Sequence, residues 1–172
     1  MKYITIIAIT FLYFSCSFVS IPDGLKPVDN FEIKKYLGKW YEIARIDNRF
    51  EKNLIKKTAI YSLNDDGTIK VLNRGYNIVD KEWKEYERKA KFVQKRSLGR
   101  LKVSFFGPFY RGYNIIDIDK KGYEWSIASG PNRDYLWILS RKPRINDNLL
   151  MELLLKVEDF GYKTEDLIFV GN

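Results

Sequence analysis

The stretch GKWYEIARI, residues 38–46, decides the fold of this chain. Gly38 opens the stretch and lets the backbone bend, and the large indole of Trp40 is suited to closing the narrow end of a barrel. A strand sends every second side chain to one face, so the residues in step with Trp40 share its inward side. We therefore predict a first strand over 39–46 that starts at a barrel floor.

The chain continues as short runs with a period of two, separated by turn residues at spacings of about ten positions. The turns carry Asn, Asp and Gly, for example in the segments 64–67 and 119–122. No long helical pattern interrupts these runs, so the pattern favours a β-sandwich or a β-barrel. The predicted strands, eight in number, are 39–46, 57–63, 68–78, 83–93, 100–106, 112–118, 123–129 and 135–141.

One amphipathic helix is expected after Pro143, where the apolar period changes from two to that of a helix. Asn146 or Asp147 caps its start and Gly161 ends it. A last apolar run, 167–170, is long enough for a short extra strand. The fold class is therefore all-β: an eight-stranded antiparallel up-and-down β-barrel with one C-terminal α-helix. The apolar face of the helix comprises Leu149, Leu150, Leu153, Leu154, Val157 and Phe160.

The composition excludes several classes of function. The 172 residues fit one domain, and 45% hydrophobic and 16% aromatic residues indicate a packed core. Because the chain has 0 histidines, Ser-His-Asp catalysis and His-ligated zinc or haem are excluded, and we expect no cofactor and no metal. Lys+Arg 30 against Asp+Glu 22 leaves a formal charge of +8.

The basic residues crowd the predicted strands 83–93 and 100–106. A recognised nucleic-acid-binding motif is lacking there, so no nucleic-acid partner is expected. Two interpretations stay open: attraction to an anionic membrane surface, and a solvated strand face that blocks edge pairing.

The N-terminus is typical of an export signal. Lys2 precedes an apolar run over 3–14, which is shorter than the ~20 residues of a membrane-spanning helix. A transmembrane anchor is therefore not expected.

The segment YFSCS, residues 13–17, resembles a bacterial lipoprotein cleavage box, with Tyr13 where such boxes usually carry Leu. Cys16, the single cysteine, would then be acylated and anchor the chain to a membrane. The alternative is an ordinary secretory signal with an incidental cysteine. We expect a lipoprotein signal peptide at 1–15 and a lipidated N-terminal tether at 16–30.

Three signature regions of the sequence resemble the lipocalin family. They are the Gly-x-Trp motif at 38–40, the Asp-Tyr pair at 134–135 and the strand-ending Arg141 just before the helix. Across 31–170, the sequence resembles the bacterial group of outer-membrane lipoproteins related to apolipoprotein D. Further segments that carry this resemblance are 42–45, 61–63, 75–77, 103–110 and 113–114.

The resemblance implies a lipocalin barrel domain over 31–172, with structural roles for Gly38, Trp40 and Arg141. The last strand lies beside the first in such a barrel, so the Arg141 guanidinium is expected to lie on the Trp40 face and donate to nearby carbonyls. The alternative is an isolated core tryptophan and a surface arginine.

Strand alternation also predicts which side chains face the cavity. The first strand is set by Trp40 and the last by Arg141, whereas the other strands are assigned by apolarity, so a slip of one residue would invert a set. The lining is mostly aromatic and aliphatic, with small residues that leave room, as in a pocket for an apolar ligand. The predicted cavity-lining residues are Glu42, Ala44, Ala59, Tyr61, Val71, Asn73, Gly75, Arg88, Ala90, Phe92, Val103, Phe105, Tyr113, Ile115, Trp125, Ile127, Tyr135, Trp137 and Leu139.

Glu42 and Arg88 are the charged exceptions in this lining. Buried charges need partners, so the two are expected to pair with each other or with Asn73 and tyrosines. Arg88 or a lysine at the mouth would also suit a fatty-acid carboxylate or a phosphate group. Neither residue is interpreted as catalytic.

The sequence leaves three classes of function open. The favoured class is a lipid-anchored protein on the periplasmic side of the outer membrane, which stores or transports fatty acids or lysophospholipids. The alternatives are a structural envelope lipoprotein with a filled barrel and, with less support, a lipid-modifying enzyme, for which no activated nucleophile is recognisable. A homodimer is left open.

Overall fold

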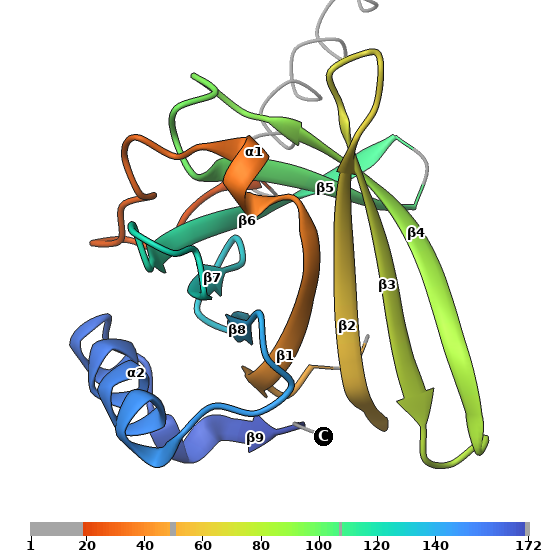
Figure 1. Cartoon of the computed structure of the whole chain (residues 1–172), viewed down its shortest axis with the longest axis vertical. Helices are drawn as coiled ribbons and strands as arrows, with labels where there is room; N and C mark the ends of the chain where they lie inside the picture. The colour runs from red at the N-terminus through yellow and green to blue at the C-terminus, as the bar shows by residue number, and fades with distance from the viewer. Residues whose placement is uncertain (1–18, 49–50, 107, 171–172) are drawn as a thin grey trace, which may run out of the picture.

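The computed structural model describes residues 19–48, 51–106 and 108–170, except for the side chains of Phe105 and Phe106. Its strands are β1 (Gly38–Ile46), β2 (Leu54–Leu63), β3 (Ile69–Asn77), β4 (Glu82–Phe92), β5 (Arg100–Phe106), β6 (Phe109–Ile118), β7 (Trp125–Ser129), β8 (Leu136–Ser140) and β9 (Leu167–Phe169). Each strand from β1 to β8 pairs antiparallel with the next, and β1 also pairs with β8, which closes the barrel (Figure 1). The predicted eight-stranded up-and-down barrel is confirmed.

The predicted C-terminal helix is α2 (Asp147–Asp159), which lies against the outside of the barrel beside β7 and β8 (Figure 1). Asn146 caps it, because its side chain accepts a hydrogen bond from the backbone N–H of Leu149 at 2.8 Å. After a 3-10 turn, η2 (Thr164–Asp166), the chain returns to pair β9 with β1. This pairing is the short extra strand expected from the last apolar run.

Two strands begin three residues earlier than predicted, β2 at Leu54 and β6 at Phe109. In β2 a bulge lies between Ile55 and Thr58, and Lys56 has a left-handed backbone with φ of 52°. A bulge adds one residue to a strand and inverts the alternation before it. A period of two therefore cannot reveal the first residues of β2.

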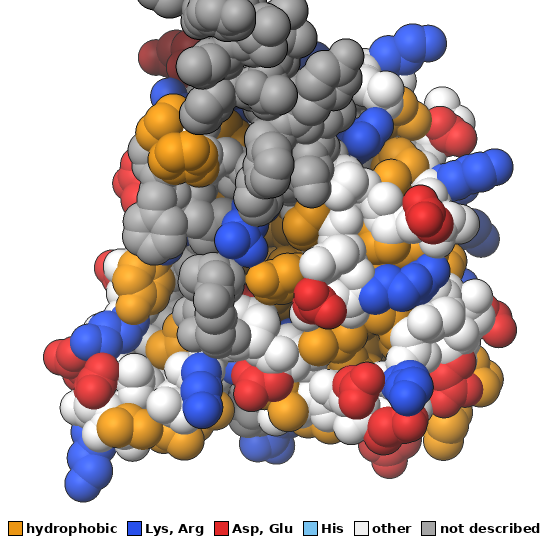
Figure 2. Space-filling model, turned by 180° about the vertical axis from the view of Figure 1, so that it is seen from behind, with side chains coloured by type: hydrophobic (Ala, Val, Ile, Leu, Met, Phe, Trp, Pro, Cys, Tyr) orange, Lys and Arg blue, Asp and Glu red, His pale blue; other side chains and the backbone are white. Residues whose placement is uncertain are grey.

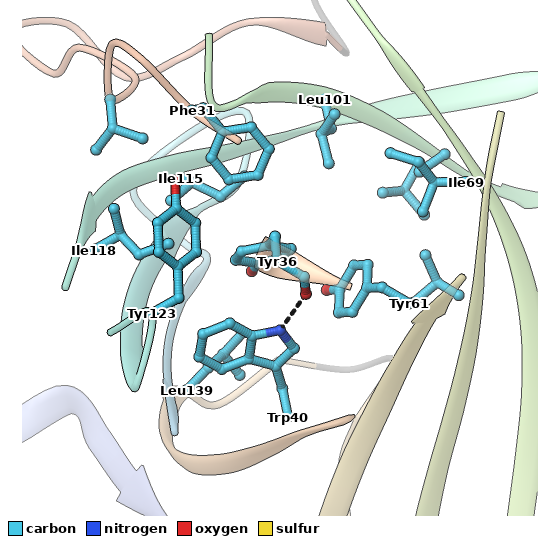
Figure 3. Packing of buried hydrophobic residues seen from close by; sticks show 14 residues of the cluster. Phe31, Tyr36, Trp40, Tyr61, Ile69, Leu101, Ile115, Ile118, Tyr123 and Leu139 are labelled. Atoms are coloured by element: carbon cyan, nitrogen blue, oxygen red, sulfur yellow. Dashed lines mark hydrogen bonds between the residues drawn. The ribbon is translucent and has the colours of Figure 1, made fainter. Parts of the chain in front are cut away.

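Trp40 and the short helix α1 (Ile33–Tyr36) close one end of the barrel (Figure 3). Trp40 is fully buried, and its indole N–H donates to the carbonyl of Tyr36 at 2.8 Å. The Arg141 guanidinium lies 3.8 Å from the centre of the Trp40 ring, on the face where the sequence places it. Gly38 has a φ of +94°, a conformation that favours glycine. Arg141 also donates to the main-chain carbonyls of Lys35, Lys39 and Tyr123.

The hydrophobic core has two parts, one inside the barrel and one between the barrel and α2. Figure 3 shows the interior part, where aromatic rings from α1, β1 and β2 meet. Its largest members include Phe31, Tyr36, Trp40, Tyr61, Leu101 and Ile115. The outer part includes Ile43, Ile116, Ile127, Ile138, Leu153 and Val157.

Residues 19–31 lie packed along the barrel, whereas the sequence suggested a tether over 16–30. Val28 is buried, its N–H donates to the carbonyl of Ile115 at 2.9 Å, and its carbonyl accepts from Gly99 at 2.9 Å. The Pro and Gly content of this segment favoured a linker. The hydrogen bonds of Val28 join it to residues far away in the sequence, and composition does not reveal such contacts. The signal peptide and residues 16–18 lie outside the described residues.

The described surface mixes charge and apolarity. Figure 2, the view from behind, shows basic side chains interspersed with acidic and hydrophobic ones. Within the described ranges, none of the helices is long and apolar enough to cross a membrane.

Candidate functional site

A pocket enters the barrel at the end opposite Trp40. Its cavity volume is about 80 Å³, which is room for several water molecules, and the open space that includes solvent at the mouth is about 520 Å³. The segment between β1 and β2 contributes Glu51 to this mouth, and the rest of the lining comes from the strands. The lining residues are Glu42, Glu51, Lys57, Ala59, Tyr61, Val71, Asn73, Arg88, Val103, Tyr113, Trp137 and Leu139.

Most of the predicted cavity residues on β2, β3, β4 and β8 meet at this pocket. On β2, β3 and β4 their positions follow from regular alternation beneath an outer face that is largely polar, and on β8, whose outer Leu136 and Ile138 are buried, they follow from the position of Arg141. Their role in ligand binding stays a prediction. The predicted residues at the pocket are Glu42, Ala59, Tyr61, Val71, Asn73, Arg88, Val103, Tyr113, Trp137 and Leu139.

Other predicted residues lie inside the barrel but away from the pocket lining. Ala90 and Ile115 are fully buried in the interior cluster, and Phe92 packs against it. Gly75 faces Lys57, since a Cβ on Gly75 would come within 3.0 Å of the Lys57 Cγ. Gly75 therefore makes room for a protein side chain, not for open space.

Tyr135 flanks the pocket wall. Its ring is stacked with that of Trp137 at a centroid distance of 6.1 Å, and its hydroxyl accepts a hydrogen bond from Arg111 at 3.1 Å. For Phe105 the structure describes only the backbone in β5, and Cys16 lies outside the described residues. The cavity-lining role of Phe105 and the acylation of Cys16 therefore stay predictions.

Ala44 was assigned to the wrong face. The register between β1 and β8 shifts between Glu42 and Ala44, so that Glu42 pairs with Leu139 while Ala44 pairs with Ile138. This bulge turns Ala44, and Ile46 after it, to the outer cluster.

Trp125 and Ile127 were also assigned to the wrong face. Ile127 is fully buried in the outer cluster, and Trp125 packs against that cluster with Lys156 of α2 over its ring at 5.5 Å. Because α2 covers the outer face of β7, that face is the more apolar one, and the inner face carries the small residues Ser126 and Ala128. Choosing the inward face by apolarity therefore gave the wrong result.

A network of buried charges occupies the mouth. Glu42 accepts from Arg45 at 2.7 Å and from Lys57 at 2.6 Å, and Lys57 also pairs with Glu51. The expected pairing of Glu42 with Arg88 is wrong. Arg88 instead lies 5.2 Å from the ring of Tyr86, one of the tyrosine contacts left open.

Sequence reasoning missed three members of this network. Residues that are three positions apart on a regular strand face opposite sides, so Arg45 reaches Glu42 only because β1 has a bulge between them. Lys57 is in step with Ala59 and Tyr61 on β2, and Glu51 comes from a connecting segment. Alternation alone would therefore have placed Lys57 inside, but the choice of apolar residues left it out of the predicted lining.

The partners within the network keep Glu51 and Lys57 ionised. Burial would raise the pKa of Glu51, but Lys57 and hydrogen bonds from Asn48 and Trp137 lower it to about 2. Burial would lower the pKa of Lys57, but Glu42 and Glu51 raise it above its ordinary value. Burial raises the pKa of Glu42, against the effect of Lys57 and Arg45. The ammonium of Lys57 is thus compensated within the protein.

Tyrosine hydroxyls meet below the charged network. The hydroxyl of Tyr61 donates to that of Tyr113 at 3.1 Å, and the hydroxyls of Tyr113 and Tyr36 are 3.0 Å apart. Burial raises the pKa of each of these tyrosines, so the hydroxyls stay neutral. The pocket therefore combines apolar walls, neutral hydroxyls and a charged mouth.

These features suit the binding of an amphipathic molecule. The walls remove apolar surface from water, and the polar groups at the mouth and floor give it an orientation. Among the described residues, no group of three or more Asp, Glu, His or Cys is placed to hold a metal ion.

Comparison with known proteins agrees with this architecture. The family model for the lipocalin-like domain matches residues 31–172. The chain belongs to the lipocalin family. This bears out the resemblance seen in the sequence. It is 45% identical over 88% of its length to "Outer membrane lipoprotein Blc" of Vibrio cholerae, with 89% of that protein covered.

Relatives and solved structures extend the match. The "Outer membrane lipoprotein Blc" of Citrobacter freundii is 48% identical over 93% of this chain and 90% of its own length. The cockroach allergen Per a 4 has a similar fold, with a TM-score of 0.69 at 19% identity, covering 89% of this chain and 95% of the allergen. The allergen therefore supports the fold alone.

Proposed function

We propose that this lipocalin is a lipid-anchored protein on the periplasmic side of the outer membrane that binds fatty acids or lysophospholipids. The observation that carries the proposal is a pocket whose apolar walls lead from a charged mouth toward a neutral floor. The bacterial relatives, which are outer membrane lipoproteins by name, support the location and the anchor. Cys16 is the residue that would carry the acyl chains.

A fully buried acyl chain supplies enough energy for binding, and a cavity of about 80 Å³ must widen to take it. For a chain of sixteen carbons, ~14 buried methylenes at ~0.8 kcal/mol each give roughly 11 kcal/mol before ordering costs. Micromolar affinity then needs no special polar contact. One methylene is worth only ~1 kcal/mol in an apolar pocket, so we expect tolerance of chain length.

Arg88 is the group that would meet an anionic headgroup. It is half-buried at the pocket, on the part of β4 nearer the mouth than the fully buried Ala90. Lys57 is a poorer candidate because Glu42 and Glu51 already compensate it. The acyl chain would then run inward along Val103 and Leu139.

Native mass spectrometry of the delipidated protein starting at Ser17, titrated with palmitate or a lysophospholipid, tests this proposal. We expect saturable binding of one ligand per chain. Arg88→Gln should weaken it about tenfold, since a hydrogen bond to a charged group is worth ~1.5 kcal/mol or more. Lys89→Gln is the matched control, because Lys89 is exposed and pairs with Asp66 outside the barrel.

Two results would overturn the proposal. A folded barrel that binds neither lipid would favour the structural lipoprotein. Conversion of the bound lysophospholipid in the same spectra would favour a lipid-modifying enzyme.

A further inference from the structure

The outer surface of β4 and β5 carries positive charge that the described residues do not neutralise. Lys91 and Lys102 are direct cross-strand partners, and like charges in that position destabilise a sheet. Lys70 and Lys89 are also direct partners, but they pair with Glu87 at 2.9 Å and Asp66 at 3.5 Å. Within the described ranges, no salt bridge joins Lys91 or Lys102 to a carboxylate. The pair of Lys91 and Lys102 is therefore suited to an anionic partner outside the chain.

An aromatic ring lies between these two lysines. The ammonium of Lys102 is 5.1 Å from the centre of the Tyr110 ring, and that of Lys91 is 5.7 Å from it. A tyrosine with an apolar ring and a polar hydroxyl suits the boundary between water and lipid. We call Lys91, Lys102, Tyr110 and the neighbouring Arg100 the basic face.

The N-terminal segment reaches the barrel at this basic face. Arg100 donates to the carbonyl of Val19 at 3.3 Å, and Asn114 donates to the carbonyl of Ser20 at 3.1 Å. Gly112, the register partner of Lys102, has no side chain because a Cβ there would lie 2.5 Å from the Ser20 carbonyl oxygen. The chain therefore crosses the barrel directly beside Lys102.

The length of chain up to the anchor sets the distance from the membrane. Val19 is three positions after Cys16, and an extended chain spans at most ~3.6 Å per position, or about 11 Å in all. This is close to the ~8–10 Å over which charges act at physiological salt. An acylated Cys16 would hold the basic face within reach of lipid headgroups.

We propose that the basic face rests on an anionic phospholipid surface, so that the closed-end part of β4 and β5 faces the membrane. The inference rests on the proposed acylation of Cys16. Lys91 and the start of β4 at Glu82 are nine residues apart, or about 30 Å along the strand. The mouth of the pocket therefore points away from the site of contact.

The orientation can be measured on the acylated full-length protein. Acylation removes the only native thiol, so Lys89→Cys beside the basic face and Val79→Cys at the tip of the β3–β4 turn each accept one fluorescent label. The vesicles contain phosphatidylethanolamine, phosphatidylglycerol and a headgroup nitroxide quencher. We expect strong quenching at position 89 and little at position 79, where the side chain is 65% exposed at the mouth.

Stronger quenching at position 79 than at 89 would overturn the inference in favour of mouth-first docking. Equal quenching at both positions on protein that floats with the vesicles would also overturn it, while leaving the anchor intact. Protein that does not float at all would instead contradict the proposed anchoring.

The charges can be tested without the anchor. For protein starting at Ser17, we expect Lys91→Glu with Lys102→Glu to weaken association with phosphatidylglycerol vesicles at least tenfold, at ~1 kcal/mol per basic residue. Lys120→Glu with Lys121→Glu makes the same change in net charge at the exposed β6–β7 turn, and should weaken it less than twofold. Equal losses in both variants with intact circular dichroism would show that net charge acts, and would overturn the basic face.

Discussion

The two ends of the barrel are stabilised in different ways, although β1 contributes to both. At the closed end, Trp40 packs under Tyr36 and Arg141 bonds to main-chain carbonyls. At the mouth, Glu42 lies only two residues along the same strand and takes part in a network of four buried or partly buried charges. Packing tolerates changes in pH, whereas compensated charges depend on every partner being present. The closed end is built to be rigid, and the mouth is built around ionised groups.

The largest effect is expected from removing the packing of the closed end. Trp40→Ala should lower the free energy of unfolding by about 3–5 kcal/mol, because the ring is fully buried and leaves a cavity. Urea unfolding followed by circular dichroism measures this change. Trp83→Ala is the matched control, since Trp83 is 47% exposed and its removal should cost less than about 1 kcal/mol. Equal losses in the two variants would contradict the role of Trp40 as the floor.

Removing the central cation of the mouth should have the next largest effect. Lys57→Met keeps the length of the side chain but leaves Glu42 and Glu51 facing each other, at a cost of about 3 kcal/mol at neutral pH. Urea unfolding measures this cost as well. Adding Glu42→Gln should recover part of it, because the remaining Glu51 is partly exposed. Lys89→Met, which breaks an exposed pair with Asp66, should cost less than about 1 kcal/mol. A loss as small for Lys57→Met would mean that solvent, not Lys57, compensates the carboxylates.

The difference between the two ends also explains which features of the fold and the site could be predicted from the sequence. The barrel, its helix and the contact of Arg141 with Trp40 follow from regular alternation and a local motif, so they were accessible without coordinates. The bulge in β1 was not, and it turns Arg45 inward and Ala44 outward, whereas Lys57 on β2 was missed because the lining was chosen by apolarity. Periodicity reports regular strands, and it loses the face of a strand wherever one residue is added.

A second limit was that the outer face of β7 is more apolar than its inner face, which carries Ser126 and Ala128. Trp125 and Ile127 cover the barrel from outside beneath α2, a contact that arises only when the C-terminal helix docks. On β2 to β4, where the outer face is polar, the same reasoning placed Tyr61, Val71 and Arg88 at the pocket. Pocket residues can therefore be predicted on strands that have one solvent-exposed polar face. They cannot be predicted where a helix covers the barrel, or where charged residues come from connecting segments.

The smallest effect is a dependence on pH that belongs to the mouth alone. The pKa of Glu51 is lowered from 4.5 to about 2, so its ionised form stabilises the fold above pH 4.5, and that contribution is lost as the pH falls toward 2. Glu51→Gln should therefore lower the free energy of unfolding by about 2 kcal/mol at pH 7, with wild type and variant converging near pH 2. Glu42 has a raised pKa, which acts in the opposite direction, but it is present in both proteins and cancels in their difference to first order. Glu165→Gln at an exposed position controls for net charge. A wild-type-minus-variant difference that does not change between pH 7 and pH 2 would show that Lys57 does not hold Glu51 ionised, and the mouth would then resemble the closed end in resting on packing.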